Sequence, residues 1–326
     1  MITMAEIARL THVSQPTVSR VLNGNPNVDP QIRERVLACA REHDYQPNAL
    51  AKGMKGSKTK LLGVLVTDIS NSFFAEFAKY IEAEAKLRGY SIILFNSDHD
   101  PRLEQECIDV VRRYRVDGLL AVPIHENSTE WETTAKKLDV PVVLITRSNK
   151  KFDYAYTDHC ESGKMVARHL ADRDYTRFLF VGQSYDKKFT GFRQELESLG
   201  IRKKHQVSNI NYRYGDYDQL KSDLSSYLSG INERVGIFAY NDLCAAQILH
   251  VLRDLKIEVP KQAGVVGFDD IFICKHLMPS LTTIRQPIRE MAESAVSHLI
   301  YKIEHPTEEW LLDESFCGEL IQRESS

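Results

Sequence analysis

The sequence predicts an α/β protein with a small all-α N-terminal domain and a two-lobed body built on parallel sheets. The first sixty of the 326 residues contain short helical patterns and no strand pattern. From residue 61 onward, apolar runs such as "LLGVLV" and "PVVLI" alternate with amphipathic stretches. Continuous Val, Ile and Leu strands that alternate with helices are typical of parallel sheets covered on both faces. We expect domains at 1–46, 47–60 and 61–326.

Three helices are expected in the N-terminal domain. Thr3 and Glu6 form a capping-box pattern ahead of a helix at about 4–10. Ser14 suits the N-cap of a second helix, which ends at Asn23-Gly24. Asp29-Pro30 begins a third helix that reaches about residue 43. Two short helices joined by a tight turn, with a third packed across them, form a helix-turn-helix domain.

The second helix lies in "VSQPTVSRVLNG" and presents short polar groups opposite its apolar stripe. In a helix-turn-helix domain, the front of this helix reads base edges in the DNA major groove. Gln15 suits adenine, Arg20 suits guanine, and Pro16 offers apolar contact to a thymine methyl. The expected DNA contacts from this region are Ser14, Gln15, Pro16, Thr17, Ser19, Arg20 and Asn23. An ordinary three-helix domain with a polar face is the alternative.

Charge is distributed unevenly along the chain. Residues 1–60 hold nine Lys and Arg against five Asp and Glu, a net +4, so the remainder carries −7. A basic head suggests contact with a polyanion, although charged faces are usually just solvated. We find no apolar run long enough for a membrane span and no signal-peptide pattern, so we expect a cytoplasmic protein without a membrane partner. The six scattered cysteines predict neither disulfides nor a metal site.

The body should contain two lobes, because about 260 residues of alternating strands and helices exceed one sheet. The first strand series comprises "LLGVLV", "YSIILFN", "DGLLAVP" and "PVVLI", and the second comprises "YAYTD", "RFLFVG", "QVSNINY", "RVGIFAY" and "AGVVGFDD". Ligands of such folds bind outside the carboxyl ends of the strands. Polar residues at those ends include Asp68, Arg147, Asn241 and Asp269, which suit sugar hydroxyls. Each is also a common helix cap or loop residue. Asp242 and Asp270 are expected to be such structural residues.

The segments "VS..TVSRVLNG", "Y.PN.LA", "VDGLLAVP" and "GVVGFDD" resemble the lactose-repressor (LacI/GalR) family of bacterial regulators over essentially the whole chain. The resemblance implies a dimeric repressor of palindromic operators and a body related to periplasmic sugar-binding proteins. It places lobe 1 at about 61–158 and 288–312, and lobe 2 at about 161–285 and 315–326. No leucine-repeat extension follows "LIQRESS", so we expect a homodimer.

The resemblance also implies roles for individual residues. The linker, otherwise interpreted as a flexible basic tether, would become a hinge helix on DNA, with Met54 wedged into the minor groove. Its expected DNA contacts are Asn48, Leu50, Ala51, Met54 and Lys55. The expected effector contacts are Phe73, Phe74, Arg147, Lys188, Tyr217, Asn241 and Asp269. Lys188 stands where the family usually has arginine. With Arg147 and Lys187 nearby, an acidic or phosphorylated sugar is one interpretation, and solvated lysines are the other.

The function predicted from the sequence is an operator-binding repressor of a carbohydrate operon, controlled by a sugar, sugar acid or sugar phosphate. Two alternatives are a sugar-binding protein and a carbohydrate-active enzyme without operator specificity. No phosphate-binding loop, nucleophile elbow, zinc-protease or dinucleotide motif is present. We therefore expect no catalytic residues, no cofactor and no metal.

Overall fold

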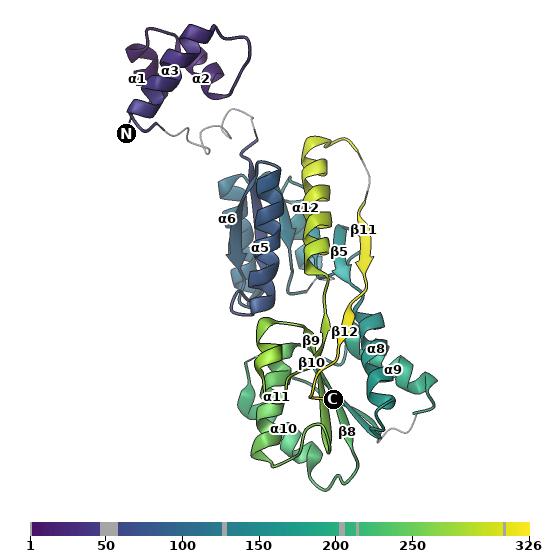
Figure 1. Ribbon diagram of the computed structural model, residues 1–326. Helices are drawn as coiled ribbons and strands as arrows, with labels where there is room; N and C mark the ends of the chain where they lie inside the picture. The colour runs from purple at the N-terminus through teal and green to yellow at the C-terminus, as the bar shows by residue number, and fades with distance from the viewer. Residues whose placement is uncertain (1, 46–57, 126–128, 202–205, 213–214, 309–310) are drawn as a thin grey trace. The chain divides into compact units, whose positions relative to one another are not determined.

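The structure is a computed structural model that describes residues 2–45, 58–125, 129–201, 206–212, 215–308 and 311–326. The chain divides into two compact units, Met1–Lys60 and Leu61–Ser326 (Figure 1). The N-terminal unit is called the head and the second unit the body. None of the helices in the described ranges is long and apolar enough to cross a membrane.

The head contains α1 (Met4–Leu10), α2 (Gln15–Leu22) and α3 (Pro30–Glu42), which confirms the three expected helices. Their apolar stripes meet in one small core, in which Ile7, Val18 and Val36 are fully buried. The helix caps are those that the sequence predicts. The Thr3 and Glu6 capping box is present, and the Asp29 side chain accepts hydrogen bonds from two amides of α3.

The turn between α1 and α2 depends on His12, which has φ 53°. His is among the non-glycine residues that adopt this left-handed conformation more readily. Gly24 ends α2 with φ +74°, a conformation that favours glycine. Arg33 then donates from Nη2 to the Asn25 carbonyl at 2.6 Å and ties the following loop to α3.

The first sheet of the body has the strand order β11-β5-β4-β3-β1-β2 and parallel pairing throughout. Its strands are β1 (Leu61–Val66), β2 (Ser91–Asn96), β3 (Gly118–Ala121), β4 (Val142–Ile145), β5 (Asp153–Thr157) and β11 (Asp313–Phe316). Helices α5 (Ser72–Leu87) and α12 (Ile288–Glu304) pack on one face, and α6 (Pro101–Tyr114) and α7 (Thr129–Lys136) on the other. Figure 1 shows α5 and α12 side by side.

The second sheet has the order β12-β10-β9-β8-β6-β7, and only the β10–β12 pair is antiparallel. Its strands are β6 (Arg177–Val181), β7 (Val207–Ile210), β8 (Val235–Ala239), β9 (Ala263–Asp269), β10 (Thr282–Arg285) and β12 (Glu319–Ile321). Helices α8 (His159–Ala171) and α9 (Lys187–Ser198) cover one face, while α10 (Tyr217–Leu228) and α11 (Asp242–Asp254) cover the other. A short 3₁₀ helix, η1 (Phe272–His276), follows β9.

The chain passes between the two sheets three times. It leaves the first sheet after β5, returns through residues 286–287 between β10 and α12, and passes from β11 to β12 through residues 317–318. The strand at 153–157 opens the second series of the sequence pattern but belongs to the first sheet, in agreement with the lobe 1 bounds of about 61–158 that the resemblance implied. Its pairing with β4 and β11 explains the difference, because sheet membership depends on long-range partners rather than on sequence order.

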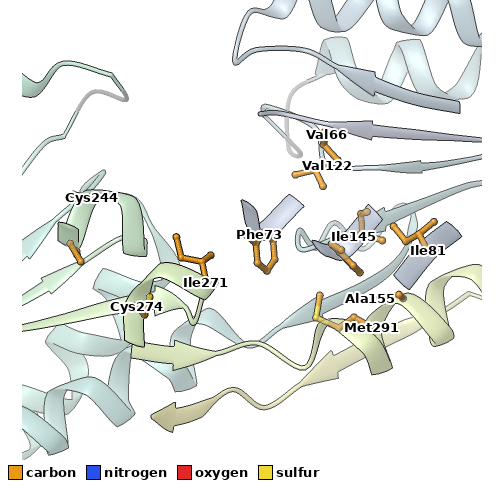
Figure 2. Close-up of a cluster of buried hydrophobic side chains, with 14 of the residues drawn as sticks. Val66, Phe73, Ile81, Val122, Ile145, Ala155, Cys244, Ile271, Cys274 and Met291 are labelled. Carbon is orange, nitrogen blue, oxygen red and sulfur yellow. The ribbon is translucent and has the colours of Figure 1, made fainter. Parts of the chain in front are cut away.

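Apolar side chains from both lobes form one continuous cluster in the body. Figure 2 shows Phe73, on the first turn of α5, between Ile145 and Val122 of one lobe and Ile271 and Cys274 of the other. Phe73 is 4% exposed, so its ring is buried among apolar side chains of both lobes. The first turn of α5 is therefore held rigidly where the strand ends of the two lobes face each other.

Helices α8 and α9 lie in backbone contact because a glycine of each helix faces the backbone of the other. A Cβ atom on Gly163 would lie 2.1 Å from the Lys188 carbonyl oxygen, and one on Gly191 would lie 1.8 Å from the Cys160 carbonyl oxygen. No side chain other than hydrogen fits at these two positions without moving a helix. The first turn of α9 is thereby fixed against α8.

Candidate functional site: a DNA-reading helix and a ligand cleft

The front of α2 carries the polar residues expected to contact DNA. Ser14 is the N-cap, and its Oγ accepts from the Thr17 amide at 3.3 Å and lies 2.8 Å from Thr17 Oγ1. Asn23 donates from Nδ2 to Ser19 Oγ at 3.4 Å. Thr17 and Ser19 are half-buried, so these four side chains shape the helix surface as well as offering hydroxyl groups.

Gln15, Pro16 and Arg20 stand out from that surface. All three are exposed. Pro16 lies in the first turn of α2, where backbone N–H groups have no intrahelical acceptor, so its lack of an N–H costs little. Within the described residues, neither Gln15 nor Arg20 has a side-chain hydrogen bond or an ion pair. Long polar side chains left unoccupied at a helix front are available for base edges. The expected linker contacts Asn48, Leu50, Ala51, Met54 and Lys55 lie outside the described residues.

A cavity of about 110 Å³ lies between the two sheets of the body, at the carboxyl ends of their strands. This inner cavity is lined by residues that follow β1, β2, β3 and β4 in one lobe, and in the other by residues that follow β6, β8 and β10 together with the end of β9. It brings together six of the seven expected effector contacts: Phe73, Phe74, Arg147, Lys188, Asn241 and Asp269. Asn241 is also the N-cap of α11, where its Oδ1 accepts from the Cys244 amide at 2.9 Å.

Tyr217 is the expected contact that the structure places elsewhere. It begins α10 and lines neither of the cavities described for the body; its ring packs toward His250 on α11, at 5.8 Å between centroids. Tyr212 lines the cleft instead, and its hydroxyl donates to Gln247 at 2.9 Å. The two tyrosines are five residues apart, Tyr212 after β7 and Tyr217 at the start of α10, and the tertiary structure places only Tyr212 at the cavity.

Asp269 has the most constrained backbone at the site. Its φ is 115° and that of Asp270 is 53°, so two consecutive non-glycine residues adopt the left-handed region, a strained arrangement found mainly at functional sites. Gln286 donates from Nε2 to Asp269 Oδ1 at 2.7 Å. Burial, reinforced by the charge of Asp242, raises the pKa of Asp269 well above its ordinary value.

Asp242 and Asp270 form more hydrogen bonds and ion pairs with distant parts of the chain than the ordinary cap or loop residues that we expected. Asp242 is fully buried; its Oδ1 accepts from Thr283 Oγ1 at 2.6 Å and its Oδ2 from the Ile271 amide at 2.9 Å. Burial raises the pKa of Asp242 to about 7. Asp270 forms ion pairs with Arg285 at 2.8 Å and Arg323 at 2.6 Å. These carboxylates hold the β9–β10 region in place beneath Asp269.

A second, larger cavity of about 680 Å³ adjoins the first. This outer cavity shares Arg147, His99, His159 and Tyr240, among others, with the inner one. Sequence reasoning did not identify five residues that line it and belong to no motif: Tyr156 on β5, His159 at the start of α8, and Gln183, Tyr185 and Tyr212 in loops. Its volume lies within the range of small-molecule sites.

The charges around the two cavities act on His159. Burial lowers its pKa well below the ordinary value, and Lys188, Arg147 and Lys187 add to that effect. His159 is therefore neutral at physiological pH and can offer both a donor and an acceptor nitrogen. In the described part of the chain, no three His, Cys, Asp or Glu side chains gather as a metal site would require. The polar groups present suit an organic ligand rich in hydroxyl groups.

Comparison with known proteins agrees with this architecture. Residues 3–48 match the model of bacterial regulatory proteins of the lacI family, and residues 167–326 match a periplasmic binding protein-like domain. The ribose operon repressor of Escherichia coli is 29% identical over 94% of both chains. Catabolite control protein A of Priestia megaterium is 31% identical over 90% of both chains.

Solved structures show the same fold. The lac repressor dimer bound to operator and the anti-inducer ONPF superposes with a TM-score of 0.84 at 20% identity, covering 99% of this chain and 98% of that one. The match extends over both the head and the body. From the helix-turn-helix head, the two-lobed body and these full-length similarities, the chain belongs to the lacI family of bacterial regulatory proteins.

Proposed function

We propose that this protein is a sequence-specific transcriptional repressor of a carbohydrate-utilisation operon, controlled by a small sugar-class molecule bound between the two lobes of the body. The head reads double-stranded operator DNA, and the body senses the effector. Full-length similarity to the ribose operon repressor supports both parts of the proposal. The matched relatives are regulators, and the proposal includes no catalytic step.

The observation that carries the DNA-binding part is the exposed pair Gln15 and Arg20 on the front of α2. Both side chains project from a helix whose opposite face, including Val18, is buried in the head core. Each can form two hydrogen bonds to one purine, Gln15 to adenine and Arg20 to guanine. Ser14, Thr17 and Ser19 contribute phosphate contacts, and Asn48, Leu50, Ala51, Met54 and Lys55 contribute contacts from the linker.

The test is selection of binding sites from a random duplex library by the full-length protein. The wild-type protein should enrich a palindromic site, and Arg20→Ala should lose preference at one symmetric pair of positions. Arg41→Ala is the matched control, because it removes the same charge from an exposed position in the last turn of α3. Sequence-independent binding by the wild-type protein would refute the proposal, and so would an unchanged site preference in Arg20→Ala.

The effector part rests on the position of the cavities. Both are lined by residues of the two lobes, and three chain crossings connect those lobes, so a bound molecule contacts both. A ligand that binds one lobe arrangement more tightly than another shifts the equilibrium between them. Two such bodies in a homodimer would convert this shift into a change in the spacing of two heads on a palindromic operator. Operator binding also implies residence in the cytoplasm.

A further inference from the structure

The outer cavity contains two cations that the described residues leave without a counter-ion. Arg147 follows β4 and is half-buried, and it takes part in none of the ion pairs of the described chain. Lys187 begins α9 and is exposed at the opposite wall. Keeping a half-buried guanidinium unpaired costs free energy, so such a group in a cavity indicates an anionic ligand.

The carboxylates nearby do not neutralise these two cations. Asp186 is the one carboxylate among the residues that line the outer cavity, and its Oδ2 lies 3.5 Å from Lys188 Nζ. Lys188 points toward the inner cavity, with its Nζ 4.4 Å from the centroid of the Phe268 ring. The inner cavity contains two further carboxylates: Asp68, whose Oδ1 accepts hydrogen bonds from the amide and the hydroxyl group of Ser70, and Asp269, whose raised pKa reduces its negative charge. The outer cavity therefore has a local excess of positive charge.

Arg147 and Lys187 belong to one group of hydrogen-bond donors. Lys187 Nζ donates to Ser148 Oγ at 2.8 Å, and Ser148 is the neighbour of Arg147 in the chain. Lys187 Nζ also lies 5.5 Å from the centroid of the Tyr156 ring, which fixes the side chain over the cavity wall. The β4 side thus supplies a guanidinium and a hydroxyl group, and the α9 side supplies an ammonium group.

We propose that the effector is a phosphorylated sugar whose phosphate group binds between Arg147, Ser148 and Lys187 in the outer cavity, while its hydroxyl groups occupy the inner cavity. This inference rests on the proposed effector-controlled function and names the chemical class of the ligand. A phosphate monoester carries close to two negative charges near neutral pH and three strong acceptor oxygens. It therefore matches two cations without a counter-ion and an adjacent hydroxyl group better than a singly charged carboxylate does.

Because Arg147 lies on one lobe and Lys187 on the other, the phosphate would bridge the two lobes. An arginine can hold two phosphate oxygens with its planar fork, and a lysine acts as a point charge on the third. Binding would be favourable only when the two walls are close enough for both cations to reach the same group. The anion would then stabilise the closed arrangement directly.

The test uses the full-length protein and inorganic phosphate as the probe. Thermal midpoints are measured in phosphate, acetate and chloride at equal ionic strength and pH, and binding is quantified by titration. Phosphate should raise the midpoint above that in chloride, and acetate should not. Arg147→Gln and Lys187→Gln should each weaken phosphate binding at least tenfold. Arg193→Gln is the matched control, since Arg193 is an exposed cation on the same helix, paired with Glu197.

Midpoints of the variants in chloride that equal or exceed that of the wild-type protein would show that the variants fold. Phosphate binding that persists in both variants would identify an adventitious ion only and would overturn the proposal. Equal effects of phosphate and acetate would overturn the phosphate assignment, and no response to phosphate would overturn it as well. Failure of the phosphate proposal can be distinguished from failure of the proposed function. The proposed function is tested by operator selection with the wild-type protein in the absence of any ligand.

Discussion

Replacing Gly191 by alanine tests whether close contact between α8 and α9 organises the cleft wall. The added Cβ atom would lie 1.8 Å from the Cys160 carbonyl oxygen, whereas ordinary contacts begin at 3.4 Å. Relief requires a displacement of about 1.6 Å between two backbones, and neither has a flexible side chain that could move instead. Overpacking of this kind typically costs about 1–3 kcal/mol, and we expect the upper end.

In a helix interior, alanine is more favourable than glycine by about 1 kcal/mol. Subtracting this gain from the overpacking cost of about 3 kcal/mol leaves a net destabilisation of about 2 kcal/mol. For a unit of this size, that corresponds to a midpoint lower by about 4–8 °C in thermal unfolding followed by circular dichroism. Arg193→Ala on the exposed face of α9 is the control and should leave the midpoint nearly unchanged. A Gly191→Ala protein as stable as the wild type would refute the packing argument.

Further predictions concern the head and the buried carboxylates. Ser14→Ala should destabilise the head by about 1 kcal/mol through loss of the α2 cap, measured on the isolated transition of the head in the full-length protein. Arg20→Ala should weaken binding to the selected operator by about 1–3 kcal/mol in a filter-binding titration, with little change on random DNA. Asp242 has a folded pKa of about 7 against 3.8 in model compounds, so stability falls as pH rises from about 4 to 7. The slope is about 1.4 kcal/mol per pH unit, and Asp242→Asn should remove it from thermal midpoints measured at pH 5 and 7. Asp269→Ala should preserve operator binding and abolish its response to the effector, and a normal response would contradict the cleft assignment.

Local patterns were sufficient to predict most elements of the chain. Capping residues such as Ser14 and Asp29 mark helix starts because their side chains satisfy amides of the same turn, so the signal lies within a few residues. The same holds for the His12 turn and for apolar strands such as β1. The exposed polar face of α2 could also be predicted, because the apolar stripe of the helix determines which side is buried.

The ligand cleft was only partly predictable. Strand-end positions identified Arg147, Asn241 and Asp269 because parallel strands bring their carboxyl ends to one edge of a sheet. The same reasoning could not distinguish Tyr212 from Tyr217, whose side chains depend on how the loop after β7 turns. Nor could it show that Asp186 pairs with Lys188, while Lys187 has no carboxylate partner among the described residues.

The sequence by itself determined the α/β class, the three helices of the head and the exposed polar face of α2, because these depend on neighbours within one or two turns of chain. Only the tertiary structure decided that Gly163 and Gly191 hold two helices at backbone contact. It also decided which cations lining the outer cavity have no carboxylate partner among the described residues. Such features depend on groups far apart in the chain, and local periodicity carries no information about their distance.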